Sequence, residues 1–517
     1  MLKNRRFSPI IIILFLLLFT RFYNLERTAR FIWDESSDLV RMHQIYIDRN
    51  LTLIGPISED GNKVFSSLTY YLLLPFTVMG GFHPVSPVYG TAFWGTFTVI
   101  LLLILVRRLT ENKIIFYLTA VLLVVWHPLI ETSRWAWNPN LIPFWTAFGL
   151  LMFYEILPTL RYASGGVSLL SASQRITSAS SIHPHPNRRG ILEISDKNKN
   201  WSLFLSGLFF GFTVHHHYIS IFSLIGFWLI VLIKYLREKH YLKIVYFTLG
   251  VGLALSPFII FDLTHPPGLF LSRLLYFNYI GAASPGISNF ILKLILTLDS
   301  TFNYLIPLAL IKYIFYVIFG VLFIKDIKNK SFPLVFIFVF FIQIVGVTLI
   351  ENFYPHYIIP GIIFFLVYIV YQRPKNIIIY QKILLLLLIT ASLFTLRTLL
   401  TKVTWENDIR SINKITDITE DQIKQYDLKN NNIASIASPD PNTYGRRYRD
   451  LLHLKGVSLK TKDEYYISDH LFVISTSSEE VIRNDKAYEM SFFNKGKLVQ
   501  MWEIENSEWV VYLFERN

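Results

Sequence analysis

Repeated apolar runs, each long enough to cross a lipid bilayer, are the feature that most constrains this chain. An α-helix needs roughly 20 mostly apolar residues to cross the hydrocarbon core, and only helices or closed barrels satisfy their backbone polar groups there. The sequence therefore predicts an α-helical polytopic membrane protein with about eleven transmembrane helices. The predicted spans lie near residues 7–19, 88–106, 114–130, 141–158, 201–215, 218–234, 243–261, 303–324, 332–350, 357–371 and 383–400.

Charge distribution around these runs predicts the topology. Lys3, Arg5 and Arg6 precede the first run, no small-residue cleavage site follows it, and further spans come after, so we expect an uncleaved span rather than a signal peptide. Basic residues then gather in alternate loops, as expected for cytoplasmic loops. These loops are residues 107–108, 234–243, 325–330 and 373–382. We expect a multi-pass protein of the cell membrane, with a cytoplasmic N-terminus and an extracytoplasmic C-terminus.

The net charge of +13 does not point to nucleic acid. After residue 400 the chain holds 16 Lys and Arg against 19 Asp and Glu, so the basic excess belongs to the membrane part. Loop bias in a multispanning protein produces such an excess. The sequence has no cysteine, which excludes disulfides, thiolate metal sites and a cysteine nucleophile.

Two domains are expected. Residues 1–400 would form the transmembrane domain, with large outer loops at residues 25–87 and 262–299, and residues 401–517 a small extracytoplasmic α/β domain. In the second domain the composition predicts both helices and alternating strands. The expected helices are residues 405–426 and 446–454, and the expected strands are residues 433–437, 471–474, 498–504 and 509–514, the last two forming a hairpin.

Polar groups concentrate on the predicted outer face, whereas the cytoplasmic side offers mainly basic loops. Acid, imidazole, cation and aromatic groups on one side are typical of a site for a polar, partly anionic substrate. The candidates are Asp34, Glu35, Glu131, Arg134, Trp137, Asn138, His215, His216, His217, Tyr218, Asp262, His265, Arg273, Tyr354, His356 and Tyr357.

The adjacent pair Asp34 and Glu35 is the candidate for proton transfer. A carboxylate can accept the proton of a reacting hydroxyl, or bind a metal that acidifies it. Neighbouring side chains point in different directions, so only one of the two is expected to meet the reacting atom. The alternative is a pair of helix-capping or surface acids.

Cations and histidines give further candidates. Arg134, Arg273 and Lys312 are candidate partners for a phosphate. Lys312 falls within an apolar run, where a cation is costly and usually functional; alternatively the helix begins late and the ammonium reaches water. The adjacent histidines at 215–217 cannot all face one ion, so interfacial packing is the alternative to metal binding.

Several short motifs, taken in order, resemble the C-type polyprenyl-phosphate-dependent glycosyltransferases, in the branch of protein O-mannosyltransferases and lipid A aminoarabinose transferases. The resemblance covers residues 7–400. Its motifs are Phe-Ile-Trp-Asp-Glu at 31–35, Glu-Thr-Ser-Arg-Trp-Ala-Trp-Asn-Pro-Asn at 131–140, His-Tyr at 217–218, Phe-Asp-Leu-Thr-His at 261–265 and Tyr-Pro-His-Tyr-Ile-Ile-Pro at 354–360.

The resemblance implies an inverting sugar transfer from a polyprenyl-phosphate donor to a hydroxyl of a protein, lipid or glycan, next to membrane lipids. Asp34 would be the catalytic base, with Glu35 orienting it or the acceptor. Fixed cations would stabilise the leaving phosphate, namely Arg134, Arg273 or Lys312. Residues implied in sugar or acceptor binding are Glu131, Trp137, Asn138, His217, Tyr218, Asp262, His265, His356 and Tyr357.

No cofactor is certain from the sequence, and a divalent metal is a candidate only. The outer loops lack a second acidic cluster of the Asp-X-Asp type, so a metal like that of the oligosaccharyl transferases is not supported; Glu131 is the candidate substitute. Two other functions compete with the transferase: a lipid-linked-sugar flippase or transporter, and a non-catalytic scaffold. A transporter usually has repeated halves and polar groups near the midplane, and neither is evident.

Overall fold

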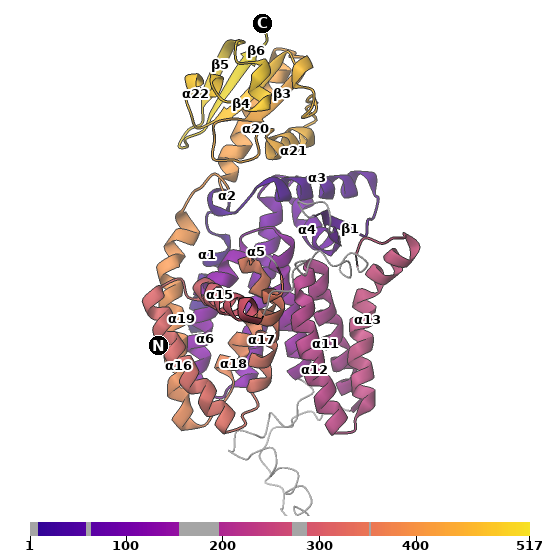
Figure 1. The fold of residues 1–517 in the computed structure, drawn as a ribbon, viewed down its shortest axis with the longest axis vertical. Coiled ribbons are helices and arrows are strands. Elements are labelled where there is room, and N and C mark those ends of the chain that lie inside the picture. Colours follow the sequence, from indigo (N-terminus) through magenta and orange to yellow (C-terminus); the bar gives the residue numbers. More distant parts are fainter. Residues whose placement is uncertain (1–8, 58–63, 155–195, 271–286, 351–352) are drawn as a thin grey trace, which may run out of the picture.

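The computed structural model describes residues 9–57, 64–154, 196–270, 287–350 and 353–517. Figure 1 shows a bundle of helices with a small mixed-sheet domain at one end, which contains the C-terminus. The bundle side of the chain comprises α1 (Pro9–Phe22), α2 (Leu25–Thr28), α3 (Trp33–Asp48), β1 (Ile54–Ile57), β2 (Val64–Ser66), α4 (Leu68–Met79), α5 (Ser86–Leu109), α6 (Lys113–Val125), α7 (His127–Ser133), η1 (Asn138–Leu141), α8 (Ile142–Tyr154), α11 (Asp196–His216), η3 (Tyr218–Ser220), α12 (Ile221–Arg237), α13 (Tyr241–Thr264), α15 (Ile287–Leu305), α16 (Ala309–Lys328), α17 (Leu334–Thr348), η5 (Pro355–Ile358), α18 (Ile359–Val370) and α19 (Lys375–Thr401).

Apolar helices make up the bundle, which confirms the predicted helical multispan fold. Among the described residues, four helices are long and apolar enough to cross a membrane alone, and two bent helix pairs raise this number to six. Shorter apolar helices occupy the predicted spans at residues 7–19, 332–350 and 357–371. Helices α8 and α11 coincide with the described parts of the predicted spans at residues 141–158 and 201–215. The four single helices are residues 86–109, 218–237, 241–264 and 375–401.

Two predicted spans are wrong as single straight helices. Residues 114–130 include most of α6 and part of α7, which are bent by 44° relative to each other. Residues 303–324 include the end of α15 and most of α16, and these two helices are bent by 112° relative to each other. The break contains Pro307, which lacks a backbone N–H and disfavours helical geometry at the preceding residue. The apolar composition is continuous across the break, so hydropathy alone gave no sign of it.

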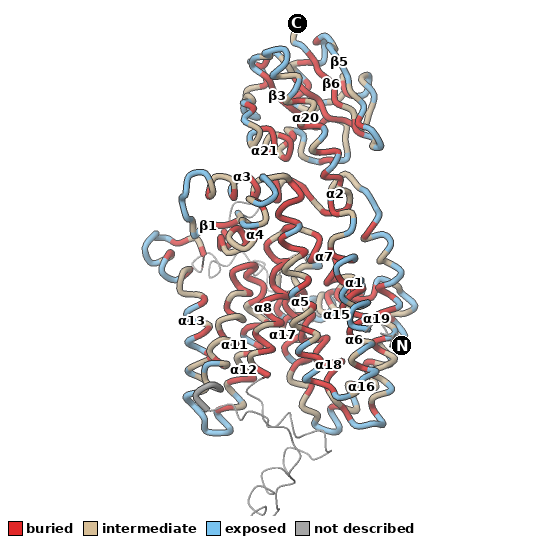
Figure 2. The backbone as a smooth tube through the Cα atoms, turned by 180° about the vertical axis from the view of Figure 1, so that it is seen from behind, coloured by how far each residue is buried: buried red, intermediate tan, exposed pale blue. Residues whose placement is uncertain are grey.

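The interior of the bundle is closely packed. Helix α5 is buried along much of its length, whereas α13 exposes many apolar side chains at the surface (Figure 2). Helices α11 and α13 approach closely through two glycines: a Cβ on Gly207 would overlap the carbonyl oxygen of Phe247, and one on Gly250 would overlap that of Phe204. Small residues allow such close backbone contact between membrane helices.

The C-terminal domain has the predicted α/β composition. Its four-stranded sheet has the order β3-β4-β6-β5, with β3 and β4 parallel and the other pairs antiparallel. The predicted hairpin is the β5–β6 pair, and the predicted helix at 446–454 is α21. The elements are α20 (Ile409–Gln425), β3 (Asn431–Ser435), α21 (Arg446–Leu454), η6 (Tyr465–Ile467), β4 (His470–Ser475), α22 (Glu479–Arg483), η7 (Tyr488–Phe492), β5 (Lys497–Glu503) and β6 (Val510–Glu515).

The C-terminal domain packs directly on the first loop of the bundle. One core cluster joins Phe31 and Leu39 of that loop to Tyr448 and Leu452 of α21, all of them buried. Figure 1 shows α20 and α21 on the side of the domain that faces α2 and α3. The first loop is therefore held between the membrane helices and the C-terminal domain.

Candidate functional site

The acidic pair lies in the first turn of α3, which begins at Trp33. Glu35 is only 2% exposed, and both of its carboxylate oxygens accept hydrogen bonds. Oε2 accepts from the backbone N–H of Ile32 at 2.7 Å, and Oε1 accepts from the indole N–H of Trp135 at 2.5 Å. The capping interpretation therefore holds for Glu35, which caps the start of its own helix and binds Trp135 in the segment between α7 and η1.

Burial sets the electrostatics of Glu35. Desolvation and the neighbouring Asp34 raise the pKa of Glu35 to about 7, against the opposing effects of its two hydrogen bonds and of Arg30. Asp34 is half-buried and lies beside this carboxylate. The two acids thus occupy different environments, as their adjacent positions in the sequence predicted.

A third carboxylate, Asp38, was not predicted as a site residue. It is buried one helical turn after Asp34, and its Oδ1 accepts a hydrogen bond from the Tyr70 hydroxyl at 2.8 Å. Burial raises the pKa of Asp38 well above its usual value. The i, i+4 spacing to Asp34 was the available signal, because such residues share a helix face.

Trp135 and Trp137 extend the site along the segment between α7 and η1. The Arg30 guanidinium lies 4.4 Å from the Trp135 ring centroid, and the backbone of Arg30 pairs with that of Trp135 in a parallel bridge. Trp135 stacks on Trp137 with centroids 4.2 Å apart and planes 11° from parallel. The segments that contain Arg30 and Trp135 are therefore adjacent at the acidic pair.

Trp137 in turn meets the later motifs. The ring of His356 stands edge-on to that of Trp137, with the ring centroids 4.4 Å apart. The centroid of the His217 ring lies 5.2 Å from that of His356. The ring centroid of Tyr357 lies 5.5 Å from that of His217. Trp135, Trp137, His356 and His217 thus form a continuous series, called here the aromatic row. The aromatic row contains residues of three of the five motifs noted in the sequence, and the hydrogen bond from Trp135 to Glu35 connects it to a fourth.

The neighbouring histidines hold the first loop on the bundle. His216 Nε2 accepts from the Trp145 indole N–H at 2.7 Å, which leaves Nδ1–H to donate to Thr69 Oγ1 at 2.9 Å. His215 Nε2–H donates to the Ala254 carbonyl at 2.6 Å, and its Nδ1 pairs with Ser66 Oγ at 2.8 Å. These rings are packing groups, in line with the alternative to metal binding.

Within the described ranges, no group of three or more acidic, histidine or cysteine side chains is arranged to hold a metal ion. Nearby residues have structural contacts instead. The Tyr218 hydroxyl donates to the Val64 carbonyl, and Asn138 Nδ2 donates to the His216 carbonyl at 2.5 Å. These contacts attach β2 and η1 to the end of α11 and the start of η3.

Arg134 is a structural residue in this geometry. It is 4% exposed, and its Nη atoms donate to the carbonyls of Thr20, Arg21 and Tyr23 and to the Thr28 hydroxyl. These partners belong to the end of α1 and to α2. Because its terminal donors are taken by protein acceptors, the prediction of phosphate binding by Arg134 has no geometric support.

Lys312 also has protein partners. It lies in the first turn of α16, and its ammonium donates to Asp299 at 2.5 Å and to Asn303 at 2.8 Å. The helix therefore begins late, as the alternative interpretation had it, but the side chain is buried beside Asp299 rather than reaching water. Arg273, the third predicted phosphate partner, lies outside the described residues.

The remaining predicted residues lie outside the aromatic row. Asp262 Oδ1 accepts from the backbone N–H groups of Leu269 and Phe270, so it organises the turn after α13, while His265 is exposed and stacks on Phe261. Glu131 pairs with His127 at 3.7 Å on α7. Glu131 also interacts with the Tyr304 hydroxyl on α15.

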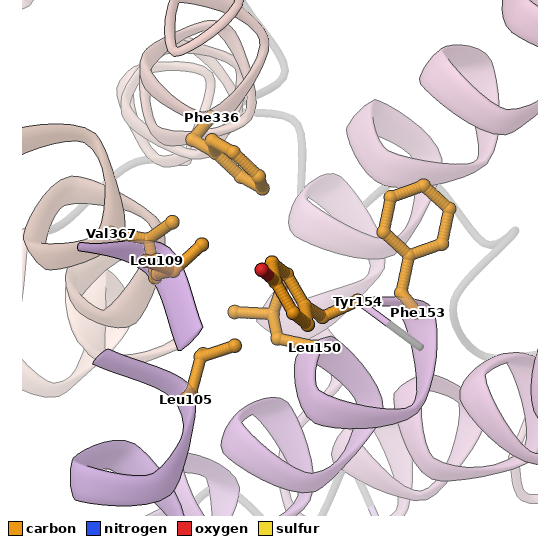
Figure 3. A pocket seen from close by; sticks show the side chains of 7 residues that line it. All are labelled: Leu105, Leu109, Leu150, Phe153, Tyr154, Phe336 and Val367. Carbon is orange, nitrogen blue, oxygen red and sulfur yellow. The ribbon is translucent and has the colours of Figure 1, made fainter. Parts of the chain in front are cut away.

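A small cavity in the bundle interior is no substrate site. Figure 3 shows its lining, which comes from α5, α8, α17 and α18 and is apolar except for one tyrosine hydroxyl. That hydroxyl, on Tyr154, donates to the Arg108 carbonyl at 2.6 Å. With a volume of about 10 Å³ the cavity has room for a single water at most.

Comparison with solved structures identifies the fold. The chain is similar to ArnT from Cupriavidus metallidurans bound to undecaprenyl phosphate, with a TM-score of 0.55 and 10% sequence identity over 98% of this chain and 97% of that one. The apo state of the same ArnT gives a TM-score of 0.55 and 10% identity over 98% and 96% of the two chains. The helical bundle and the C-terminal domain together therefore have an ArnT-like fold.

A weaker likeness, with a TM-score of 0.44 and 11% identity, relates 87% of this chain to 64% of the Archaeoglobus fulgidus oligosaccharyltransferase in its apo form. No protein-family model and no sequence among the curated proteins matches the chain significantly. The relationship is thus one of fold, at an identity too low to carry function by itself.

Proposed function

We propose that this protein is a membrane glycosyltransferase that moves a sugar from a polyprenyl-phosphate donor to an acceptor hydroxyl on the extracytoplasmic side. The observation that carries the proposal is the aromatic row, which brings four sequence motifs together at the acidic pair of α3. The shared fold with ArnT, a protein that binds undecaprenyl phosphate, supports the donor class.

Asp34 is the proposed base and Glu35 its positioning partner. Both Glu35 oxygens already accept hydrogen bonds and the side chain is buried, whereas Asp34 is half-exposed. Asp34 would take the proton of the acceptor hydroxyl as its oxygen attacks the anomeric carbon. The bond from that carbon to the phosphate oxygen breaks on the opposite face, so the configuration inverts and polyprenyl phosphate leaves.

The leaving phosphate needs a fixed positive charge. Arg30 is the cation that lies at the aromatic row, above Trp135, and its second contact is a 3.5 Å ion pair with Glu406. We therefore add Arg30 to the candidates, beside Arg273. The rings of Trp137 and Tyr357 offer flat surfaces for the sugar or the first isoprene units.

Replacing Asp34 by Asn tests the proposal. Release of polyprenyl phosphate, measured on purified protein with a lipid extract as donor source, should fall about 10²- to 10⁴-fold, because an amide cannot accept the proton. Thermal stabilisation by added undecaprenyl phosphate should be retained. Asp48→Asn is the matched control, since Asp48 is exposed at the far end of α3 and should leave turnover unchanged.

Full turnover by Asp34→Asn would contradict the proposal. A transporter would instead show lipid movement without release of polyprenyl phosphate, and a scaffold would show neither. The donor sugar and the acceptor would follow from glycan and lipid profiles of a deletion strain, before and after rescue with the wild-type gene.

A further inference from the structure

The C-terminal domain reaches the turn of α3 that carries the acidic pair. The hydroxyls of Ser36 and Ser37, which directly follow Glu35, both donate to Oδ2 of Asp450 on α21, at 2.6 and 3.0 Å. The Trp33 carbonyl is a second acceptor within reach of each hydroxyl, at 3.0 and 2.8 Å, and each hydroxyl has a single proton to share between the two. Asp450 is thus the acceptor that links this turn to another part of the chain.

The same domain holds the residues just before the acidic pair. The backbone N–H of Phe31 donates to the Glu406 carbonyl at 2.7 Å, and the Glu406 carboxylate pairs with Arg30 at 3.5 Å. Residues 30–31 and residues 36–37 therefore both form hydrogen bonds or ion pairs with residues of the C-terminal domain. Asp34 lies between these two attachments.

The contact is partly buried, which shields its hydrogen bonds from water. Ser36 has no exposed surface, and Phe31, Leu39, Tyr448 and Leu452 belong to one core cluster around it. Burial raises the pKa of Asp450, while the hydrogen bonds from Ser36 and Ser37 oppose this. An acceptor in such surroundings is costly to leave unpaired, so the geometry of the turn is strongly constrained.

We infer that the C-terminal domain positions the acidic pair of the active site, and that Asp450 fixes the first turn of α3 through Ser36 and Ser37. This inference rests on the proposed transferase function. Asp450 is a positioning residue, because it acts on Asp34 through the helix backbone and does not touch the reacting atoms. A displacement of the base by about 1 Å can cost as much as 10² in rate.

Two substitutions of Asp450 separate positioning from simple loss of the side chain. Asp450→Ala removes the acceptor and should lower kcat about 10- to 100-fold with the KM for the lipid donor unchanged. Asp450→Asn keeps an oxygen that accepts from the serines, and should restore most of kcat. Lys455→Met is the control, because it breaks ion pairs with Asp417 and Glu420 inside the C-terminal domain and should leave kcat unchanged.

A double-mutant cycle tests the path through the serines. The Ser36→Ala/Ser37→Ala variant should lose about as much kcat as Asp450→Ala, and combining all three changes should add little. Hydrogen exchange of the amides at residues 33–38, measured on the full chain, should become faster in Asp450→Ala and stay slow in Asp450→Asn.

Additive losses in the cycle, or an unchanged kcat per folded molecule in Asp450→Ala, would overturn the inference. Full turnover by Asp34→Asn would overturn the proposed function instead. The exchange measurement needs no turnover, so unchanged exchange at residues 33–38 in Asp450→Ala overturns the positioning contact whatever the chemistry.

Discussion

At the scale of the residue, two adjacent acids have different environments because a helix begins beside them. Trp33 starts α3, so the Glu35 side chain folds back to the Ile32 N–H while Asp34 stays half-exposed. The sequence predicted that only one of the two would face the reaction. It did not predict the bond from Trp135, because that partner lies 100 positions away and neither charge nor spacing marks it.

The raised pKa of Glu35 predicts a pH-dependent stability. Its pKa rises from 4.5 to about 7 on folding, so the folded state binds this proton more tightly. The stabilisation is full below about pH 4.5 and is lost as the pH rises through 7. We expect Glu35→Gln to remove this pH dependence. The melting temperature of the variant, relative to that of the wild type, should therefore rise between pH 5 and pH 8.

The pH-dependent contribution of Glu35 to the free energy of unfolding is at most about 3 kcal/mol, because each pKa unit corresponds to 1.36 kcal/mol. The amide can accept only one of the two hydrogen bonds and meets a donor with its NH₂ group, so Glu35→Gln should also be less stable than wild type at pH 5. A difference between the two melting curves that stays constant with pH would contradict the prediction.

At the scale of the element, hydropathy located the helices but not their partners or breaks. The run at residues 243–261 was predicted, and α13 spans Tyr241–Thr264. Its close contact with α11 depends on Gly207 and Gly250, which a hydropathy profile does not distinguish from other small residues. The 112° bend before α16 likewise depends on local backbone chemistry inside a continuous apolar run.

The glycine contact gives a prediction with an internal control. Gly250→Ala places a Cβ against the backbone of Phe204, which cannot move without shifting α11. We expect it to lower the yield and the melting temperature of the protein in detergent, with a cost of about 1–3 kcal/mol for overpacking. Gly252→Ala, two residues away, meets no atom within 4 Å and should behave as wild type. Equal behaviour of the two variants would count against close packing of α11 and α13.

At the scale of the whole molecule, composition predicted most of the architecture. The apolar runs predicted the helical bundle, and alternating patterns predicted the C-terminal strands and their hairpin. The docking of α21 on α3 could not be predicted, because Ser36, Ser37 and Asp450 are common surface residue types until the fold brings them together. For the same reason Arg134 and Lys312 were predicted as phosphate ligands although protein acceptors surround them.

The orientation in the membrane is a prediction that this cysteine-free chain makes easy to test. Single cysteines at Lys429, in the C-terminal domain, and at Lys239, between α12 and α13, replace two side chains that form no part of the proposed site. A membrane-impermeant maleimide added to intact cells should label Lys429→Cys and leave Lys239→Cys unlabelled until the cells are opened. The reverse pattern would put the acidic pair in the cytosol and end the proposed mechanism.

The hydrogen bond between Ser36 and Asp450 joins positions 414 residues apart, so during biosynthesis it can form only long after Ser36 has been made. At 5–20 residues per second, a ribosome needs roughly 20 to 80 s to reach Asp450 after it has made Ser36. Throughout that interval the nascent chain carries α3 without the surface that covers Phe31 and Leu39. The first loop therefore lacks this contact until α21 has been made, and chains that stop before α21 never form it.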